Sequence, residues 1–293
     1  MSKRSKTILV TGATGRQGGA VLKHLRERGF PVRAVTRDPD RPEARRLASP
    51  GTEVVRGDLS DTASLSRALD GASGVYSVQD SKPGGETEIQ QGLNLVNIAN
   101  RLRIDHLVYS SVASADRNTR IPHFESKFRL EEHIRNSGLH YSIFRPVFFM
   151  ENLLGMKSAI EQGTFSMPLD PQTRLQMIAI DDIGAFVAMA FEHPGSWGDQ
   201  VTELAGDELS MQEIADSFGR ISGHPVRYSQ IPWDEFERQS GRAYTIMYRW
   251  FQQEGYHVDI ARLRQHRQQL LTFDRWLSLN WSRAGAAGST MSH

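Results

Sequence analysis

In the first half of the chain, six short β-branched and apolar runs alternate with segments whose apolar residues recur at helical spacing. The runs cover residues 7–10, 32–36, 53–56, 74–78, 106–110 and 141–144. Strands that alternate with helices are typical of βαβ units, whose strands lie parallel and whose crossovers are almost always right-handed. The sequence therefore predicts an α/β fold with a doubly wound parallel sheet and a ligand site at the carboxyl ends of its strands.

The length of the chain predicts a second lobe. Its 293 residues exceed the roughly 250 at which single hydrophobic cores stop growing. After Arg145-Pro146 the βα alternation breaks, so we assign residues 1–150 to the main domain and residues 151–180 and 193–293 to a smaller, mixed α+β lobe. A helix over 181–192 opens at two aspartates and is expected to return to the main domain. Ser210 with Glu213 predicts a capping box, and Thr272 predicts a helix start.

Charge and cysteine content exclude several classes of function. The chain has 35 Lys+Arg against 34 Asp+Glu, a formal charge of +1, so neither nucleic acid nor an anionic membrane is expected as a partner. It has no cysteine, which excludes disulfides and thiolate metal sites, and its histidines are scattered, so we expect no metal. The apolar runs are too short for a signal peptide or a membrane span, which predicts a soluble, cytoplasmic protein, monomeric or homodimeric.

A glycine-rich loop joins the first predicted strand to the first helix. Gly12, Gly15 and Gly18 stand in TGATGRQGG. Gly12 allows a tight turn, Gly15 a close approach of the backbone to a pyrophosphate, and Gly18 close packing of the helix on the strand. The loop predicts a dinucleotide site at the helix N-terminus, although a glycine turn without a ligand has the same pattern.

The end of the second predicted strand favours NADP(H), with NAD(H) as the second possibility. Thr36-Arg37 stands where a carboxylate for a ribose 2′-hydroxyl is otherwise found, and a guanidinium suits a 2′-phosphate. Arg16 and Arg41 could add to this site. The alternative is a solvated arginine that pairs with the neighbouring Asp38 or Asp40.

Residues after the third and fourth predicted strands extend the same site. Asp58 is placed to accept the adenine amino group, with Leu59 alongside the base, and Gln79 falls where a loop would cross the cofactor's ribose. A simple Asx turn explains Asp58 almost as well. Solubility alone explains a polar residue at position 79.

A candidate active site follows the fifth predicted strand. Pro122 fits the first position of a helix, which places His123 and Lys127 four residues apart on one face. In this fold a lysine here can bind the nicotinamide ribose and lower the pKa of its neighbour. The alternative is a helix lysine that pairs with Glu131 at i+4.

The chain resembles the NmrA-like family of atypical short-chain dehydrogenase/reductases. The segments that carry the resemblance are VTGATGRQGG, VTRDP, GDLSD, VYSSVAS, HFESKFRLEEHI and FRPVFFMENLL. It implies a Rossmann domain that binds NADP and a smaller C-terminal lobe. It also implies that Gly12, Thr14, Gly15, Arg16, Gln17 and Gly18 hold the pyrophosphate, Arg37 the 2′-phosphate and Lys127 the nicotinamide ribose, with Phe149 and Asn152 lining the nicotinamide pocket.

One departure from the wider superfamily bears on catalysis. Its enzymes have tyrosine four residues before the lysine, where this chain has His123. Neutral imidazole can donate a proton, and Ser111, Tyr109 and Ser114 are the other candidates for the donor. Two functions stay open: an oxidoreductase for a quinone, aromatic or polyketide-like molecule, and a non-enzymatic NADPH sensor that binds a protein partner.

Overall fold

The computed structural model describes residues 7–79 and 85–282. The described chain forms two compact units. Unit 1 is the described part of Met1–Arg145 together with Ile183–Glu203, and unit 2 is the described part of Pro146–Asp182 together with Leu204–His293.

Unit 1 is built on a sheet that has seven strands among the described residues. Their order across the sheet is β10-β6-β5-β4-β1-β2-β3. All pairings among the first six strands are parallel, so the doubly wound sheet and its six expected strands are confirmed. The strands are β1 (Ile8–Val10), β2 (Val32–Thr36), β3 (Thr52–Arg56), β4 (Gly74–Ser77), β5 (His106–Ser110), β6 (Tyr141–Pro146) and β10 (Gln200–Leu204).

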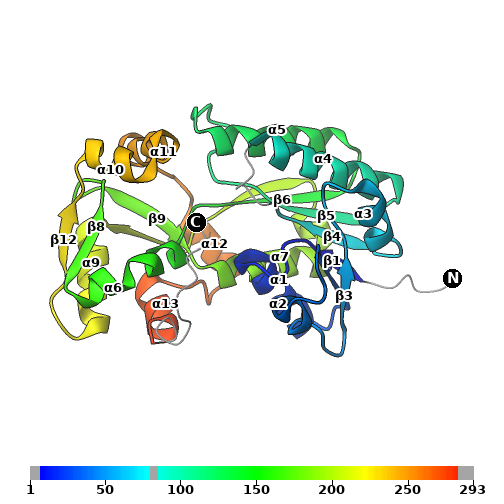
Figure 1. Ribbon diagram of the computed structural model, residues 1–293, viewed down its shortest axis with the longest axis horizontal. Coiled ribbons are helices and arrows are strands. Elements are labelled where there is room, and N and C mark those ends of the chain that lie inside the picture. The colour runs from blue at the N-terminus through cyan, green and yellow to red at the C-terminus, as the bar shows by residue number, and fades with distance from the viewer. Residues whose placement is uncertain (1–6, 80–84, 283–293) are drawn as a thin grey trace. The chain divides into compact units, whose positions relative to one another are not determined.

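Helices cover both faces of this sheet (Figure 1). On one face, the core joins Leu65 of α3, Leu95 of α4 and Leu130 of α5 to Val75 and Leu107 of the sheet. On the other face, α1 and α7 pack closely, because a Cβ at Gly184 would lie 2.7 Å from the backbone of Ala20. The helices of unit 1 are α1 (Arg16–Glu27), α2 (Pro42–Arg45), α3 (Thr62–Leu69), α4 (Gly85–Arg101), α5 (Pro122–Asn136), α8 (Pro194–Trp197) and most of α7 (Ile180–Glu192).

The seventh strand was not expected from the sequence. Residues 193–203 were assigned to the smaller lobe, but β10 joins the main sheet beside β6, and these residues belong to unit 1. Asp199 donates its backbone N–H to Tyr141 O, and the Ser142 hydroxyl donates to Trp197 O at 2.7 Å. The pattern QVTEL is short and half-polar, so only its pairing with β6 identifies it as part of this sheet.

Unit 2 combines two small sheets with a group of helices. One sheet has the order β11-β9-β7, and the other pairs β12 with β8 in parallel. The capping box of Ser210 and Glu213 and the helix start at Thr272 are both confirmed. The elements are β7 (Phe148–Phe149), η1 (Met150–Met156), α6 (Lys157–Glu161), β8 (Thr164–Met167), β9 (Arg174–Ile178), β11 (Asp207–Ser210), α9 (Met211–Ser222), β12 (Arg227–Gln230), α10 (Trp233–Ser240), α11 (Arg242–Gln253), α12 (Ile260–His266) and α13 (Phe273–Asn280).

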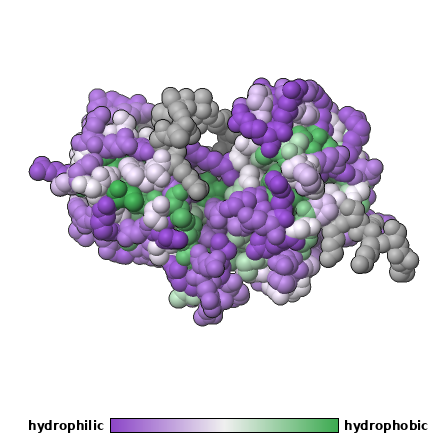
Figure 2. Space-filling view, turned by 90° about the horizontal axis from the view of Figure 1, so that it is seen from below, coloured by the Kyte–Doolittle hydropathy of each residue, from purple (hydrophilic) through white to green (hydrophobic). Residues whose placement is uncertain are grey.

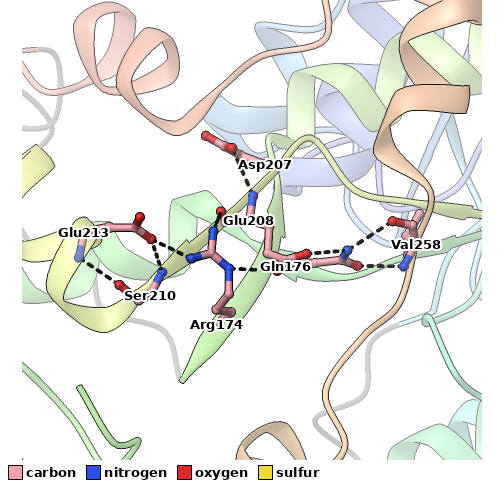
Figure 3. Close-up of polar contacts among 7 residues, drawn as sticks. All are labelled: Arg174, Gln176, Asp207, Glu208, Ser210, Glu213 and Val258. Atoms are coloured by element: carbon pink, nitrogen blue, oxygen red, sulfur yellow. Dashed lines mark hydrogen bonds and ion pairs between the residues drawn. The ribbon is translucent and has the colours of Figure 1, made fainter. Parts of the chain in front are cut away.

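A polar network joins β9, β11 and α9 within unit 2 (Figure 3). Arg174 contacts Glu208 of β11 at 2.9 Å and Glu213 of α9 at 3.1 Å. Gln176, nearly buried on β9, donates to Glu208 and to Val258 O, and its own carbonyl accepts from Val258 N at 2.8 Å. Gln176 therefore holds Val258, in the segment before α12, against the sheet.

The face shown in Figure 2 is mostly hydrophilic, with apolar residues in scattered patches. Ile221, Tyr244 and Leu279 are the large apolar or aromatic side chains that are exposed among the described residues. Within 7–79 and 85–282, no helix combines the length and the apolar character that a membrane crossing requires.

Candidate functional site

The loop between β1 and α1 has the tight backbone that its glycines predict. Gly12 has a φ of 61°, in the left-handed region that favours glycine. A Cβ at Gly18 would lie 2.2 Å from Gly12 O, so only glycine lets the first turn of α1 pack this closely on the loop. Thr11 closes the turn: its hydroxyl donates to Val78 O and accepts from Val78 N, at 2.9 and 2.8 Å.

The N-terminus of α1 has the features of an anion site. Gly15 is the N-cap, no side chain caps the helix, and its first turn has no acidic residue. The first N–H groups of a helix have no partner within the helix, and the helix dipole favours negative charge there. Thr14, Gly15 and Arg16 are exposed, so a pyrophosphate could reach these amides.

Gln17 has a role that the sequence did not suggest. Its side-chain carbonyl accepts hydrogen bonds from the Tyr76 hydroxyl at 3.3 Å and the Ser110 hydroxyl at 2.7 Å. The side chain thus ties α1 to β4 and β5. Gln17 was expected to hold the pyrophosphate. These bonds occupy its side-chain carbonyl, so its backbone N–H and its side-chain NH2 group are the donors that could do so.

Arg37 is exposed at the end of β2, and no ion pair to its guanidinium is found in the described part of the chain. The two aspartates that could have neutralised it have other partners. Asp38 lies 3.6 Å from Arg41, and Asp40 lies 3.1 Å from Arg45. A phosphate beside the end of β2 would therefore meet an unpaired guanidinium.

Asp58 forms the Asx turn that was the alternative to adenine binding. Its Oδ1 accepts from Ser60 N at 2.8 Å, and its own N–H donates to Ser64 Oγ. Leu59 is half-buried against the core under α3 and α4, and its carbonyl accepts from Asn94. The Gln79 side chain is buried and donates to Ser77 Oγ at 2.8 Å, while its carbonyl oxygen has no partner among the described residues. That buried acceptor fits a hydroxyl donor such as a ribose.

Lys127 has a partner that the sequence did not identify. Its Nζ lies 2.6 Å from Glu88 Oε1 of α4, with side chains only 13% and 2% exposed. The Ser126 hydroxyl donates to the other carboxylate oxygen of Glu88 at 3.1 Å. The alternative, in which Lys127 pairs with Glu131, is therefore wrong. Glu131 instead accepts from Ser111, Arg135 and Arg145.

His123 lies one turn before Lys127 on α5, as Pro122 at the first helical position predicts. Its ring packs edge-on against Phe124, and no hydrogen bond of its imidazole is found in the described part of the chain. Burial, and after it the charge of Lys127, lower the pKa of His123 to about 4, although Glu88 opposes them. The imidazole is therefore neutral at physiological pH, the form that keeps one N–H donor.

Ser111 is buried in a network of charges. Its hydroxyl donates to Glu131 Oε1 at 2.5 Å, and Arg145 of β6 makes two hydrogen bonds to the same carboxylate. Arg145 also contacts Asp116 at 2.8 Å. A hydroxyl that already donates to a buried carboxylate is poorly placed to give its proton to a substrate.

The other hydroxyls near the end of β5 are buried. Tyr109 Oη and Ser114 Oγ have no hydrogen-bond partner among the described residues. Burial raises the pKa of the Tyr109 hydroxyl, and the charges of Glu88 and Glu131 add to the effect. Ser114 has a φ of 63°, so it holds a strained backbone at this turn.

The remaining predicted site residues belong to unit 2. Phe149 pairs with Ile178 in the β7–β9 ladder and is half-buried, and Asn152 is exposed on η1. Between them, Glu151 accepts from Ile180 N and from Trp276 Nε1, both at 3.0 Å. Glu151 therefore fixes the segment that carries Phe149 and Asn152.

No group of three or more His, Asp or Glu side chains that could hold a metal ion is found within residues 7–79 and 85–282.

Comparison with known proteins identifies the family. The sequence pattern of the NmrA-like family matches residues 4–277. The chain belongs to the NmrA-like family. An NmrA-like family domain-containing oxidoreductase of Aspergillus hancockii is 30% identical over 264 residues, which are 81% of this chain and 79% of that protein. An NAD(P)H azoreductase of Xenophilus azovorans is 30% identical over 229 residues, 78% of each chain.

Solved structures share the fold of this chain. An NADPH-dependent quinone oxidoreductase of Escherichia coli, complexed with NADPH, has a TM-score of 0.81 at 24% identity and covers 94% of this chain and 99% of its own. The negative transcriptional regulator NmrA, in complex with NADP, has a TM-score of 0.79 at 21% identity and covers 98% and 99%. At these sequence identities, the likeness shows only that the Rossmann fold is shared.

Proposed function

We propose that this protein is an NADP(H)-dependent oxidoreductase that acts on a quinone, aromatic or polyketide-like small molecule, with NAD(H) as a weaker cofactor. The observation that carries the proposal is the pairing of two anion-binding features in unit 1. The uncapped N-terminus of α1 offers backbone amides to a pyrophosphate, and Arg37 offers an unpaired guanidinium to a 2′-phosphate.

When bound, the reduced dinucleotide supplies a hydride. Lys127 Nζ is fixed at the carboxyl side of β5, 5.9 Å from the centre of the Tyr109 ring, where it would bind the nicotinamide ribose. His123, neutral and one turn away, would donate a proton to the oxygen that gains charge. A neutral imidazole is a weaker acid than imidazolium. His123 would therefore hydrogen-bond the oxygen that gains charge, and would give up its proton only to a strongly basic alkoxide.

The similarity to known reductases supports the substrate class. The relatives named above include an azoreductase and a quinone oxidoreductase, both of which act on planar conjugated molecules. In unit 2, aromatic rings of α10 and α11 pack edge to face, with ring centres 4.9 Å apart for Phe236 and Tyr248 and 5.3 Å apart for Tyr248 and Phe251. Phe236 and Phe251 are buried, so this contact belongs to the core of unit 2. The substrate class therefore rests on the relatives alone.

Titration and turnover test the proposal. The purified chain is titrated with NADPH and NADH by calorimetry, and NADPH consumption is then followed with a panel of quinones, azo dyes and aromatic ketones. We expect tighter binding of NADPH and turnover of at least one class. In His123→Phe, kcat should fall by about 10²-fold or more while the NADPH affinity stays unchanged. Absence of NADPH consumption across the panel would refute the oxidoreductase.

A second function is an NADPH sensor that binds a protein partner. It is favoured by His123, which replaces the usual tyrosine donor, and by the likeness to a transcriptional regulator that was solved with NADP. A ligand shifts a conformation only if it binds one state better than the other. Partner capture with and without NADP(H) tests this function, and equal capture in both conditions excludes it.

A further inference from the structure

Glu88 is a buried carboxylate for which the proposed chemistry gives no role. It lies in the first turns of α4, its side chain is 2% exposed, and both of its oxygens are occupied. One oxygen accepts from Lys127 Nζ at 2.6 Å and the other from the Ser126 hydroxyl at 3.1 Å. A carboxylate held by two partners on the neighbouring helix has little freedom to move.

Close packing of α4 on α5 produces this contact. A Cβ at Gly92 would lie 2.1 Å from Leu130 Cδ2, so the glycine lets the two helices approach closely. Glu88 precedes Gly92 by four residues and Lys127 precedes Leu130 by three, so both pairs lie on the facing surfaces of the helices. The register that packs Gly92 on Leu130 therefore also brings Glu88 to Lys127.

A lysine ammonium has three N–H donors, and one of them goes to Glu88. Within residues 7–79 and 85–282, no other hydrogen bond of Lys127 Nζ is found. Without Glu88, the four-carbon side chain would move among many rotamers. With it, the ammonium stays in one place and its other donors remain available to a ligand.

We propose that Glu88 is a positioning residue, which acts through Lys127 to fix the ammonium that binds the nicotinamide ribose. The inference rests on the proposed function, since it assumes a bound dinucleotide. Glu88 also sets the charge of the site. In the protein without ligand, its carboxylate neutralises the Lys127 ammonium beside His123.

Two variants of Glu88 separate its geometry from its charge. Glu88→Asp keeps the charge but withdraws the carboxylate by one methylene, and Glu88→Gln keeps the length but removes the charge. The matched control is Glu86→Gln, because Glu86 of α4 pairs with Arg129 of α5 at 3.0 Å on the exposed surface of the same two helices. Thermal unfolding of each variant verifies that it folds. Glu88→Asp keeps a negative charge near the Lys127 ammonium, so it is expected to fold even if Glu88→Gln does not.

Calorimetry with two ligands is the test. One ligand is NADPH, and the other is 2′-phosphoadenosine 5′-diphosphate, which lacks the nicotinamide ribose. In Glu88→Asp and Glu88→Gln we expect NADPH affinity to fall about tenfold, the loss of one hydrogen bond to a charged group, with affinity for the fragment kept within about twofold. Glu86→Gln should leave both affinities unchanged.

Other outcomes overturn the inference. An NADPH affinity in both Glu88 variants that matches Glu86→Gln would show that the carboxylate does not position Lys127. An equal loss for NADPH and for the fragment would assign Glu88 to the general fold or charge of the site. If the wild type binds neither ligand, the proposed function fails, and the inference fails with it.

Discussion

Arg145 and Glu131 are joined by two hydrogen bonds, of 2.8 and 2.7 Å, and both side chains are buried. This pair connects the end of β6 to the middle of α5, where Glu131 also accepts from Ser111 and Arg135. A buried carboxylate that loses two charged hydrogen bonds is destabilised, and Ser111 with the half-buried Arg135 would compensate Glu131 only in part.

Arg145→Met should therefore lower the free energy of unfolding by about 3 to 5 kcal/mol. Denaturant unfolding followed by circular dichroism measures this loss. The control is Arg129→Met, which breaks the exposed pair with Glu86 and should cost less than about 1 kcal/mol. Equal losses in the two variants would contradict a special role for the buried pair.

Gly18→Ala should lower the free energy of unfolding by about 1 to 3 kcal/mol. The new Cβ would lie 2.2 Å from Gly12 O and would push α1 away from the loop. The same change should abolish tight binding of NADPH. Gly19→Ala is the matched control, since its Cβ would meet Ala13 O at an ordinary 3.5 Å, and alanine should even stabilise the helix slightly. Thermal unfolding and calorimetry compare the two variants, and similar behaviour would refute the packing argument.

Stability should depend on pH through His123. Its pKa is lowered to about 4 by burial and then by Lys127, against an ordinary value of 6.5 in the unfolded chain. Between these values the unfolded chain binds the extra proton, so stability is complete above pH 6.5 and is lost as the pH falls toward 4. From pH 7 to pH 5 this group should cost about 2 kcal/mol.

His123→Gln removes that titration, and its urea midpoint should change less between pH 7 and pH 5 than that of the wild type. His106 is present in both proteins. Its pKa is also lowered to about 4, by burial and by His140, so part of the pH dependence remains in the variant. A pH dependence equal to that of the wild type would show that His123 does not titrate in this range.

Arg37→Ala should weaken NADPH binding by about 10- to 100-fold, the loss of a charge-assisted contact with the 2′-phosphate, and should leave NADH binding unchanged. Arg45→Ala is the control, because Arg45 is exposed and is already paired with Asp40 at 3.1 Å. Calorimetry with both dinucleotides measures the change. A parallel loss for NADPH and NADH would assign Arg37 to something other than the 2′-phosphate.

Some parts of the site were readable from the sequence because their signals are local. The glycine loop and the start of α5 at Pro122 depend on residues within a few positions of one another, and the structure has both where the pattern predicts them. Ser111 shows the limit of such reasoning. Its place after β5 marked it as a candidate donor, but its partner Glu131 comes from a helix 20 residues later.

The alternation of strands and helices by itself determined the doubly wound sheet and placed its loops at one edge, because periodicity and turn residues act over short distances. Only the tertiary structure decided the partners of these polar side chains: Glu88 for Lys127, Glu131 for Arg145, and Tyr76 and Ser110 for Gln17. The physical reason is that a charge or amide in the interior bonds to whichever group the packing of neighbouring elements brings within 3 Å. The packing of α4 on α5 depends on the fit of Leu130 against the backbone at Gly92, and neither segment alone encodes it.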